Sequence, residues 1–270
     1  MAAGTLILVG CGQMGSAMLR GWAATGAASQ FIVVEPAGAP ASLSPAPEIA
    51  FHKDAAELGE GVAPDAVVFA VKPQIIDAVL PAYRRWARSG TLFLSIAAGT
   101  TIAKLTRHLG PEARIVRVMP NTPAAIGRAI SVACANANVR PSQRDLCDAL
   151  LAAIGDSTWV EDEALMDAVT AVSGSGPAYV FLLIEALAAA GAKSGLPAEL
   201  SMRLAKATIA GSGELALLSA EMPSKLRENV TSPGGTTRAA LDVLMADDGM
   251  QALFDRAVAA ATRRSRELAG

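Results

Sequence analysis

Histidine and cysteine are both scarce in this chain. Among its 270 residues only His52 and His108 are histidines, and only Cys11, Cys134 and Cys147 are cysteines. No two cysteines have metal-ligand spacing, and two histidines leave few ways to build a zinc centre or a histidine-based catalytic triad. We therefore expect no metal site, thiols that stay reduced, and histidines that lie at the surface.

The chain also lacks a strong excess of either charge. It carries 23 Lys and Arg against 25 Asp and Glu, a formal net charge of -2, so nothing indicates nucleic-acid binding. It begins without the basic segment, apolar core and cleavage site of an export signal, which with reduced thiols predicts a cytoplasmic protein. Hydrophobic residues make up 52% and charged residues only 18%, an apolar surplus that indicates surface hidden in an oligomer.

A glycine-rich turn follows the first apolar run. Thr5 to Val9 predicts a buried parallel strand, Gly10-Cys11-Gly12-Gln13-Met14-Gly15 comes next, and Ser16 to Thr25 has helical periodicity. In this setting the first glycine permits a tight turn, the second lets a pyrophosphate approach the backbone, and the third lets the helix pack on the strand. The free N–H groups at the start of the helix would face the phosphates. We expect a dinucleotide site here.

The second strand, Phe31 to Val34, ends in Glu35. A carboxylate at this point can accept hydrogen bonds from the adenosine ribose hydroxyls, although an ordinary solvated strand end is the alternative. No Lys or Arg occurs between Phe31 and Phe51, so nothing nearby is expected to neutralise a 2′-phosphate, which favours NADH over NADPH. The stretch from 37 to 47 is rich in Pro, Ala and Ser and predicts an irregular loop.

Further strands alternate with helices up to residue 160. Each of three strands ends in a segment suited to a ligand: 66–71 in Lys72-Pro73-Gln74, 92–96 in Ala97-Ala98-Gly99, and 114–119 in Pro120-Asn121-Thr122-Pro123. Lys72 could reach a ribose or phosphate oxygen, or could be a solvated loop lysine. Strands at 130–134 and 158–160, with a helix at 142–154 between them, complete the pattern of a doubly wound α/β sheet.

Beyond residue 160 the sequence predicts helices alone, at about 163–172, 178–192, 198–219, 237–246 and 249–267. The helix at 178–192 follows Ser173-Gly174-Ser175-Gly176-Pro177, which we expect to be a turn, and it is apolar on nearly every face, which predicts burial all round. A membrane span is disfavoured because the run is shorter than about 20 residues and contains Glu185. We expect a central helix between two domains or two subunits.

A second glycine-containing turn interrupts the helices. In Asn229 to Thr237, the sequence Ser232-Pro233-Gly234-Gly235 predicts a tight turn, and Thr236-Thr237 opens a helix. Successive backbone N–H groups there can bind an anion such as a carboxylate, helped by the helix dipole. An N-capped connection between two helices is the alternative.

The chain resembles the pyrroline-5-carboxylate reductases of proline synthesis. The resemblance covers the whole chain and is carried by both glycine turns, by the Ser173-Gly174-Ser175-Gly176-Pro177 segment, and by Ala70-Val71-Lys72-Pro73-Gln74 and Arg117-Val118-Met119-Pro120-Asn121-Thr122-Pro123. It implies a Rossmann-like domain over 1–160, a helical dimerisation and substrate-binding domain over 161–270, and an obligate homodimer, often assembled into larger rings. It also implies that NADH or NADPH reduces 1-pyrroline-5-carboxylate to L-proline.

The same resemblance implies roles for particular residues. Ser232 and the N–H groups of Gly235 and Thr236 would hold the substrate carboxylate, and Thr237 would hydrogen-bond the ring nitrogen as the catalytic group. The cofactor would contact the following residues: Gly10, Gly12, Gln13, Met14, Gly15, Glu35, Ala70, Val71, Lys72, Pro73, Ala97, Met119 and Asn121. Met222-Pro223 stands where the family commonly has His-Pro, a departure that concerns local loop contacts.

Three other functions fit parts of the sequence. A reductase of another cyclic imine, such as pyrroline-2-carboxylate, would use the same turn for its carboxylate. A β-hydroxyacid dehydrogenase would need a lysine on the central helix, but Lys193 lies at the far end of that helix. A non-catalytic dinucleotide-binding dimer would bind cofactor without turnover.

Overall fold

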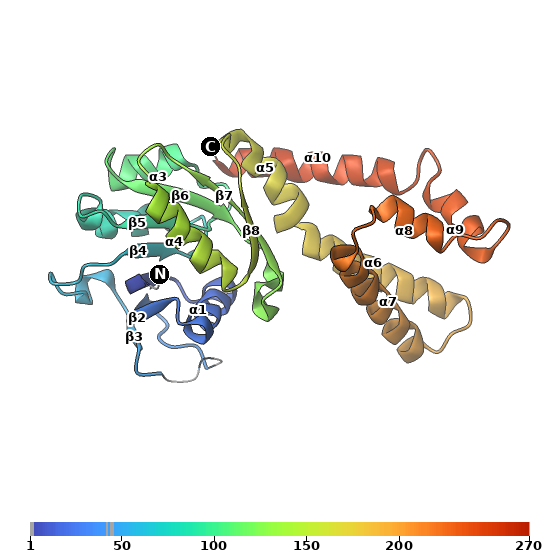
Figure 1. The fold of residues 1–270 in the computed structure, drawn as a ribbon, viewed down its shortest axis with the longest axis horizontal. Helices are drawn as coiled ribbons and strands as arrows, with labels where there is room; N and C mark the ends of the chain where they lie inside the picture. Colours follow the sequence, from blue (N-terminus) through green and yellow to red (C-terminus); the bar gives the residue numbers. More distant parts are fainter. Residues whose placement is uncertain (1–2, 42, 44–45, 270) are drawn as a thin grey trace. The chain divides into compact units, whose positions relative to one another are not determined.

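The computed structural model describes residues 3–41, 43 and 46–269. It divides into two compact units, 1–174 with 261–270, and 175–260 (Figure 1). The boundary expected at 160 was drawn where the strands end, whereas the compact first unit also includes the segment 161–174 and the end of the chain. The part of the expected loop at residues 42, 44 and 45 lies outside the described residues.

The first unit is built on one sheet of eight strands in the order β3-β2-β1-β4-β5-β6-β7-β8. Strands β1 to β6 are parallel, β7 is antiparallel to β6, and β8 is parallel to β7. The predicted doubly wound fold is confirmed. The strands are β1 Ala3–Val9, β2 Ala28–Val34, β3 Ile49–His52, β4 Ala66–Phe69, β5 Leu92–Ser95, β6 Arg114–Met119, β7 Ala129–Ala135 and β8 Gly155–Trp159.

Helices cover both faces of this sheet, because its strands are apolar on both sides. One core contains Met18, Leu19 and Trp22 of α1 (Gln13–Thr25) and Leu150 of α4 (Pro141–Ala152). The other contains Ile76 of α2 (Ile76–Val79), Tyr83 and Trp86 of the 3-10 helix η2 (Leu80–Trp86), and Leu105 of α3 (Ile102–Leu109). Short 3-10 helices complete this part: η1 Ala55–Glu57, η3 Thr122–Ile126 and η4 Glu163–Leu165.

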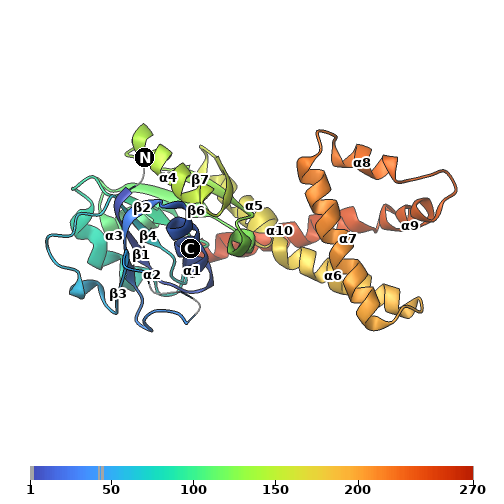
Figure 2. The same cartoon turned by 60° about the horizontal axis from the view of Figure 1, so that its bottom comes forward.

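Beyond residue 160 the structure contains the expected helices and one more. Helix α6 spans Gly176–Lys193, α7 Ala198–Leu218, α9 Thr236–Leu244 and α10 Met250–Ala269, while α8 at Pro223–Asn229 was not predicted. Figure 2 shows α7, α8 and α9 following one another. Pro177 stands in the first turn of α6, as expected. The segment before it is not a turn, however, because α5 (Met166–Val169) continues through the π-helical turn η5 (Thr170–Gly174) into α6.

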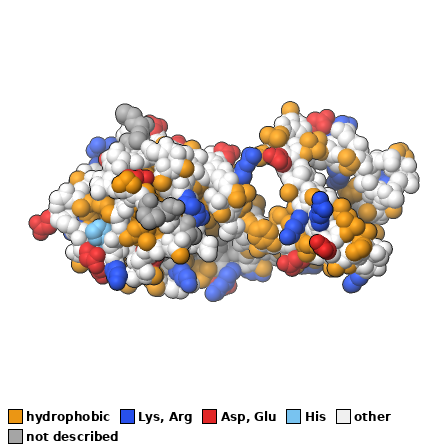
Figure 3. All heavy atoms as spheres, turned by 90° about the horizontal axis from the view of Figure 1, so that it is seen from below, with side chains coloured by type: hydrophobic (Ala, Val, Ile, Leu, Met, Phe, Trp, Pro, Cys, Tyr) orange, Lys and Arg blue, Asp and Glu red, His pale blue; other side chains and the backbone are white. Residues whose placement is uncertain are grey.

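The expectation that α6 is buried all round is wrong for the single chain. Ala188 is its only buried residue, whereas Phe181 is 57% and Leu182 64% exposed. Hydrophobic side chains are visible over the surface of the helical unit in Figure 3. The continuous helical stretch Glu163–Lys193 is 31 residues long, so by length and composition alone it could cross a membrane. The chain supplies too little apolar cover for this helix, so the cover must come from elsewhere.

Candidate active site

The predicted dinucleotide turn has the geometry that its glycines require. Gly10 has φ +90°, and a Cβ there would lie 2.8 Å from the Ala70 carbonyl oxygen, while a Cβ on Gly15 would overlap the Gly10 carbonyl. A Cβ on Gly12 would meet nothing within 4 Å, so the backbone is open to a ligand at this point. Gly12 is also the N-cap of α1 and provides no side-chain cap. The free N–H groups at the start of α1 can therefore bind an anion at this turn.

Glu35 is held against this turn. Its Oε2 accepts a hydrogen bond of 2.8 Å from the Cys11 N–H, and its Oε1 accepts one of 3.2 Å from the Ala37 N–H. The carboxylate is therefore more than a solvated strand end, because the backbone fixes its position. Its second lone pairs stay available to ribose hydroxyls.

A cleft of about 530 Å³ opens at the carboxyl ends of β1, β2 and β4. This is the point where the strand order reverses between β1 and β4, which is the usual ligand site of such sheets. Six predicted cofactor residues line it: Gly10, Gly12, Glu35, Ala70, Val71 and Lys72. Gly15 lies under the turn, and Gln13, Met14 and Pro73 flank the cleft in sequence without lining it.

Sequence reasoning missed Lys53 and Asp54, which line the same cleft. The missed strand β3 pairs with β2, and the Glu35 N–H donates to the His52 carbonyl at 2.9 Å. A basic residue is therefore close to Glu35, and the expectation that none lies nearby is wrong. The run Ile49-Ala50-Phe51 just before it was the available signal, since a short apolar run followed by charged residues fits one more strand end.

The predicted residues on β5 and β6 form a separate group along the same edge of the sheet. Ala97 is 4% exposed and follows β5, while Met119 ends β6. Asn121 is 8% exposed, and its Oδ1 accepts a hydrogen bond of 3.0 Å from the Ile130 N–H at the start of β7. This contact gives Asn121 a structural task besides any contact with a cofactor.

The predicted substrate turn lies in the helical unit between α8 and α9. The Gly235 N–H donates 3.1 Å to the Ser232 carbonyl, and Gly234 has φ +68°, which closes the tight turn. Gly235 is the N-cap of α9 and provides no side-chain cap, so Thr236 and Thr237 open the helix as predicted. Ser232 and Thr236 are exposed and Thr237 is partly buried.

The Cys11 thiol, in the glycine turn, is not a ready nucleophile. Burial, with the neighbouring Glu35 carboxylate, raises the pKa of the Cys11 thiol to about 11. The thiol is therefore neutral at physiological pH. All three cysteines are free and buried, and no cluster of potential metal ligands occurs among the residues that the structure describes.

Comparisons with known proteins decide the family. The model of the pyrroline-5-carboxylate reductase dimerisation domain matches residues 163–268, and the model of the coenzyme F420-dependent NADP oxidoreductases matches 5–99. The chain is 42% identical over 269 residues to the pyrroline-5-carboxylate reductase of Pseudomonas aeruginosa, covering 100% of this chain and 98% of that protein. The chain belongs to the pyrroline-5-carboxylate reductase family.

Other relatives agree in sequence and in fold. The pyrroline-5-carboxylate reductase of Pisum sativum is 37% identical and is aligned over 98% of this chain and 96% of its own length. The solved structure of pyrroline carboxylate reductase from Plasmodium falciparum with NADP bound has a TM-score of 0.85 at 34% identity, and that from Coxiella burnetii 0.87 at 31%, each covering 98% of both chains. The predicted family, fold class and enzyme class are confirmed.

Family membership also accounts for the exposed apolar helix. The dimerisation model covers α6 to α10 and the segment that precedes them, so the apolar surface of the helical unit is a contact surface between the subunits of an oligomer. Another subunit of the oligomer supplies the cover that a single chain does not provide.

Proposed function

We propose that this chain reduces 1-pyrroline-5-carboxylate to L-proline, with NADH or NADPH as the hydride donor. The observation that carries the proposal is the whole-length match to reductases of this family, together with an intact dinucleotide turn and an intact substrate turn. The cleft fits a dinucleotide, because Gly12 leaves room for a pyrophosphate and Gly10 admits no side chain.

The cofactor supplies the hydride that the ring carbon of the C=N bond accepts. In our proposal the N–H groups at the start of α1 hold its pyrophosphate, and the Glu35 carboxylate accepts from its adenosine ribose. Lys72, exposed in the cleft, pairs with a phosphate or ribose oxygen. The predicted contacts of Ala97, Met119 and Asn121 belong to the nicotinamide end, where the small residues from Ala97 to Gly99 let a flat ring approach.

The substrate turn positions the imine rather than activating it with a strong base. The Ser232 hydroxyl and the N–H groups of Gly235 and Thr236 bind the carboxylate, and the Thr237 hydroxyl hydrogen-bonds the ring nitrogen. Gly235 already donates to Ser232 within the turn, so a carboxylate must share or replace that bond. An iminium accepts hydride readily, so orientation and electrostatic stabilisation are the chain's main contributions.

We further propose that the N-terminal domain, 1–160, carries the cofactor and that 161–270 provides dimerisation and substrate binding. The homodimer is the minimal assembly, and rings of dimers are the larger form that we expect. The buried free thiols suit a reducing cytoplasm.

Cofactor preference depends on three charged groups of the cleft. Glu35 and Asp54 repel a 2′-phosphate, whereas Lys53 attracts it. Because Glu35 is fixed by two backbone N–H groups, we propose that NADH is preferred and that NADPH is accepted through Lys53.

Cofactor oxidation by the purified protein tests these proposals. Pyrroline-5-carboxylate is offered with NADH and with NADPH, and pyrroline-2-carboxylate is the control substrate. Fast turnover of the 5-carboxylate and a higher kcat/KM with NADH support the reaction and the preference. Faster reduction of the 2-carboxylate would favour the other cyclic imine, and cofactor binding without any turnover would favour the non-catalytic dimer.

A further inference from the structure

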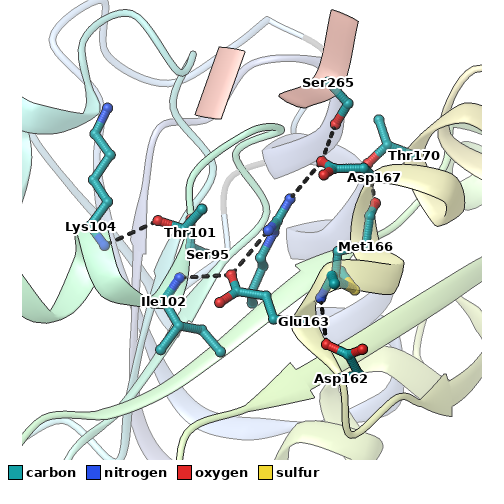
Figure 4. A network of polar contacts seen from close by, with 12 residues as sticks. Ser95, Thr101, Ile102, Lys104, Asp162, Glu163, Met166, Asp167, Thr170 and Ser265 are labelled. Carbon is teal, nitrogen blue, oxygen red and sulfur yellow. Dashed lines mark hydrogen bonds and ion pairs between the residues drawn. The ribbon is translucent and has the colours of Figure 1, made fainter. Parts of the chain in front are cut away.

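A buried polar cluster lies where the two ends of the helical segment return to the sheet. We define the Asp167 cluster as Arg117 of β6, Glu163, Asp167 and Ser265 of α10. The Arg117 side chain is 5% exposed and its guanidinium lies 3.0 Å from Glu163 Oε1 and 3.9 Å from Asp167 Oδ1. The Ser265 hydroxyl donates to Asp167 Oδ1 at 2.7 Å, as Figure 4 shows.

This cluster anchors both connections to the helical unit within the first unit. Asp167 lies on α5, just before the chain leaves the first unit after residue 174, and Ser265 lies just after the chain returns at residue 261. Arg266 adds a weaker contact, with its Nε 3.8 Å from Asp167 Oδ2. One carboxylate therefore joins the departing and the returning segment.

The cluster also holds the loop after β5. Glu163 Oε1, which pairs with Arg117, accepts a 2.8 Å hydrogen bond from the Ile102 N–H (Figure 4). On the other side of the loop, Gly99 has φ +70° and packs so closely on the last turn of α10 that an added Cβ would lie 2.9 Å from Leu268 Cβ. The segment from Ala97 to Ile102 is thus fixed at one end by Glu163 and covered by the returning helix.

The third contact reaches Met119. A Cβ on Gly174 would overlap the Met119 side chain, so the π-helical turn that follows Asp167 packs directly on this residue. Ala97 and Met119 are two of the residues assigned above to the nicotinamide end. The segments that the cluster holds thus contact both sides of that end, while the residues around Glu35 and Gly12 have no contact with the cluster among the described interactions.

We propose that the Asp167 cluster positions the nicotinamide ring for hydride transfer, with Asp167 and Ser265 as positioning residues. The inference rests on the proposed function, because it takes the loops after β5 and β6 as the nicotinamide end. Loss of the Ser265 contact frees the last turn of α10, and with it the Gly99 loop, without touching the adenosine end. Such a change reduces the rate of hydride transfer more than it weakens cofactor binding.

Ser265→Ala is the first variant, since it removes one hydroxyl and leaves Asp167 paired with two arginines. Glu163→Gln is the second, because it keeps the shape of the side chain and weakens the contacts to Arg117 and Ile102. Glu161→Gln is the matched control, because Glu161 forms an equally short ion pair of 3.0 Å with Arg144 but is exposed and lies outside the cluster. The proteins are compared as purified oligomers of the whole chain. Each is assayed at the same number of degrees below its own Tm.

Three readouts separate positioning from folding. The first is kcat, which we expect to fall about tenfold in Ser265→Ala, since small misplacements of the reacting groups are costly. The second is the primary isotope effect with NADH deuterated at C4, which we expect to rise as hydride transfer becomes rate-limiting. The third is the affinity for ADP-ribose, which lacks nicotinamide and which we expect to change less than twofold.

Unchanged kcat and isotope effect in both cluster variants would overturn the inference. So would a parallel loss of kcat and ADP-ribose affinity, because that is the result of general destabilisation. The wild-type protein is assayed first with pyrroline-5-carboxylate, so failure of the proposed function is seen there, before any variant is compared.

Discussion

The two units of this chain bury their apolar residues to very different degrees. In the first unit Leu6, Leu8 and Val68 are fully buried between a sheet and its covering helices. In the helical unit only Ala188, Ser201 and Ala205 are buried, although α6 is largely apolar. The first unit can complete its core alone, whereas the second requires a second copy. We expect the cofactor to bind to the first, self-sufficient unit and the substrate to bind to the turn before α9 in the helical, dependent unit.

The largest effect should come from charging the dependent unit. Phe181→Glu places a carboxylate on a residue that is 57% exposed in the chain and that we expect to be buried in the dimer. We expect loss of the dimer and a more than 100-fold fall in activity. Sedimentation velocity and cofactor oxidation check this. Ile126→Glu charges an apolar residue of the first unit that is even more exposed, at 77%, and should leave the dimer intact. A dimeric and active Phe181→Glu protein would remove α6 from the interface.

The converse test changes the dinucleotide turn of the first, self-sufficient unit. Gly10→Ala forces a side chain into a backbone of φ +90° and within 2.8 Å of the Ala70 carbonyl oxygen. Strain and overlap should together cost roughly 3 kcal/mol. Cofactor affinity, measured by NADH fluorescence, should fall about 100-fold while the protein remains dimeric. Gly12→Ala has open space around it and should cost less, so an equal loss in both variants would contradict the assigned geometry.

A substitution in the predicted substrate turn of the helical unit should change kcat/KM alone. Thr237→Ala removes the hydroxyl assigned to the ring nitrogen and should cost roughly 1–3 kcal/mol of transition-state stabilisation. Steady-state kinetics with pyrroline-5-carboxylate measure it, and Thr237→Ser should restore much of the rate. If Thr237→Ala kept the wild-type kcat/KM, the residue would have no part in the reaction.

The stability of the first unit should also fall at alkaline pH. Burial raises the pKa of Cys11 from 9.0 to about 11, and burial likewise raises the pKa values of Cys134 and Cys147. The folded state therefore keeps protons that the unfolded chain releases, so stability is complete below pH 9 and falls as the pH rises toward 11. Each thiol contributes at most about 1.4 kcal/mol per pH unit. Urea unfolding of wild type and Cys11→Ala at pH 8 and 10.5 should show a smaller loss in the variant. Equal losses would mean that Cys11 is not linked to folding.

Local sequence patterns predicted the first unit well, because residues close together in the chain determine its strands and its glycine turn. The turn from Gly10 to Gly15 and the strand-end position of Glu35 follow from short-range chemistry, and the structure places both at one cleft. The pairing of β3 with β2 is non-local, so its position beside Glu35 was missed, and Lys53 with it. The antiparallel direction of β7 is likewise set by its partner strand.

Beyond residue 160, the sequence patterns located helices but misjudged their surroundings. Gly174 and Gly176 indicated a turn, yet the chain is helical there, and Gly174 packs against Met119, which is distant in sequence. The apolar faces of α6 indicated burial, and the single chain leaves them exposed. The Asp167 cluster could not be foreseen, since its members come from β6, from the segment before α6 and from the end of α10.

The smallest effect should be at Lys53, the residue that β3 adds to the cofactor cleft. Lys53→Ala removes one exposed charge, and exposed ion pairs contribute about 1 kcal/mol or less. We therefore expect a fall of up to about fivefold in kcat/KM with NADPH, and no change with NADH, which lacks the 2′-phosphate. The ratio of kcat/KM with NADH to kcat/KM with NADPH measures this, and raised salt should shrink the difference because it screens exposed charges.

Asp54→Asn is the opposite variant, which should raise the NADPH rate by removing a repulsive charge from the same cleft. Equal losses with both cofactors in Lys53→Ala would place Lys53 away from the 2′-phosphate, and the preference would then depend on Glu35 and Asp54 alone.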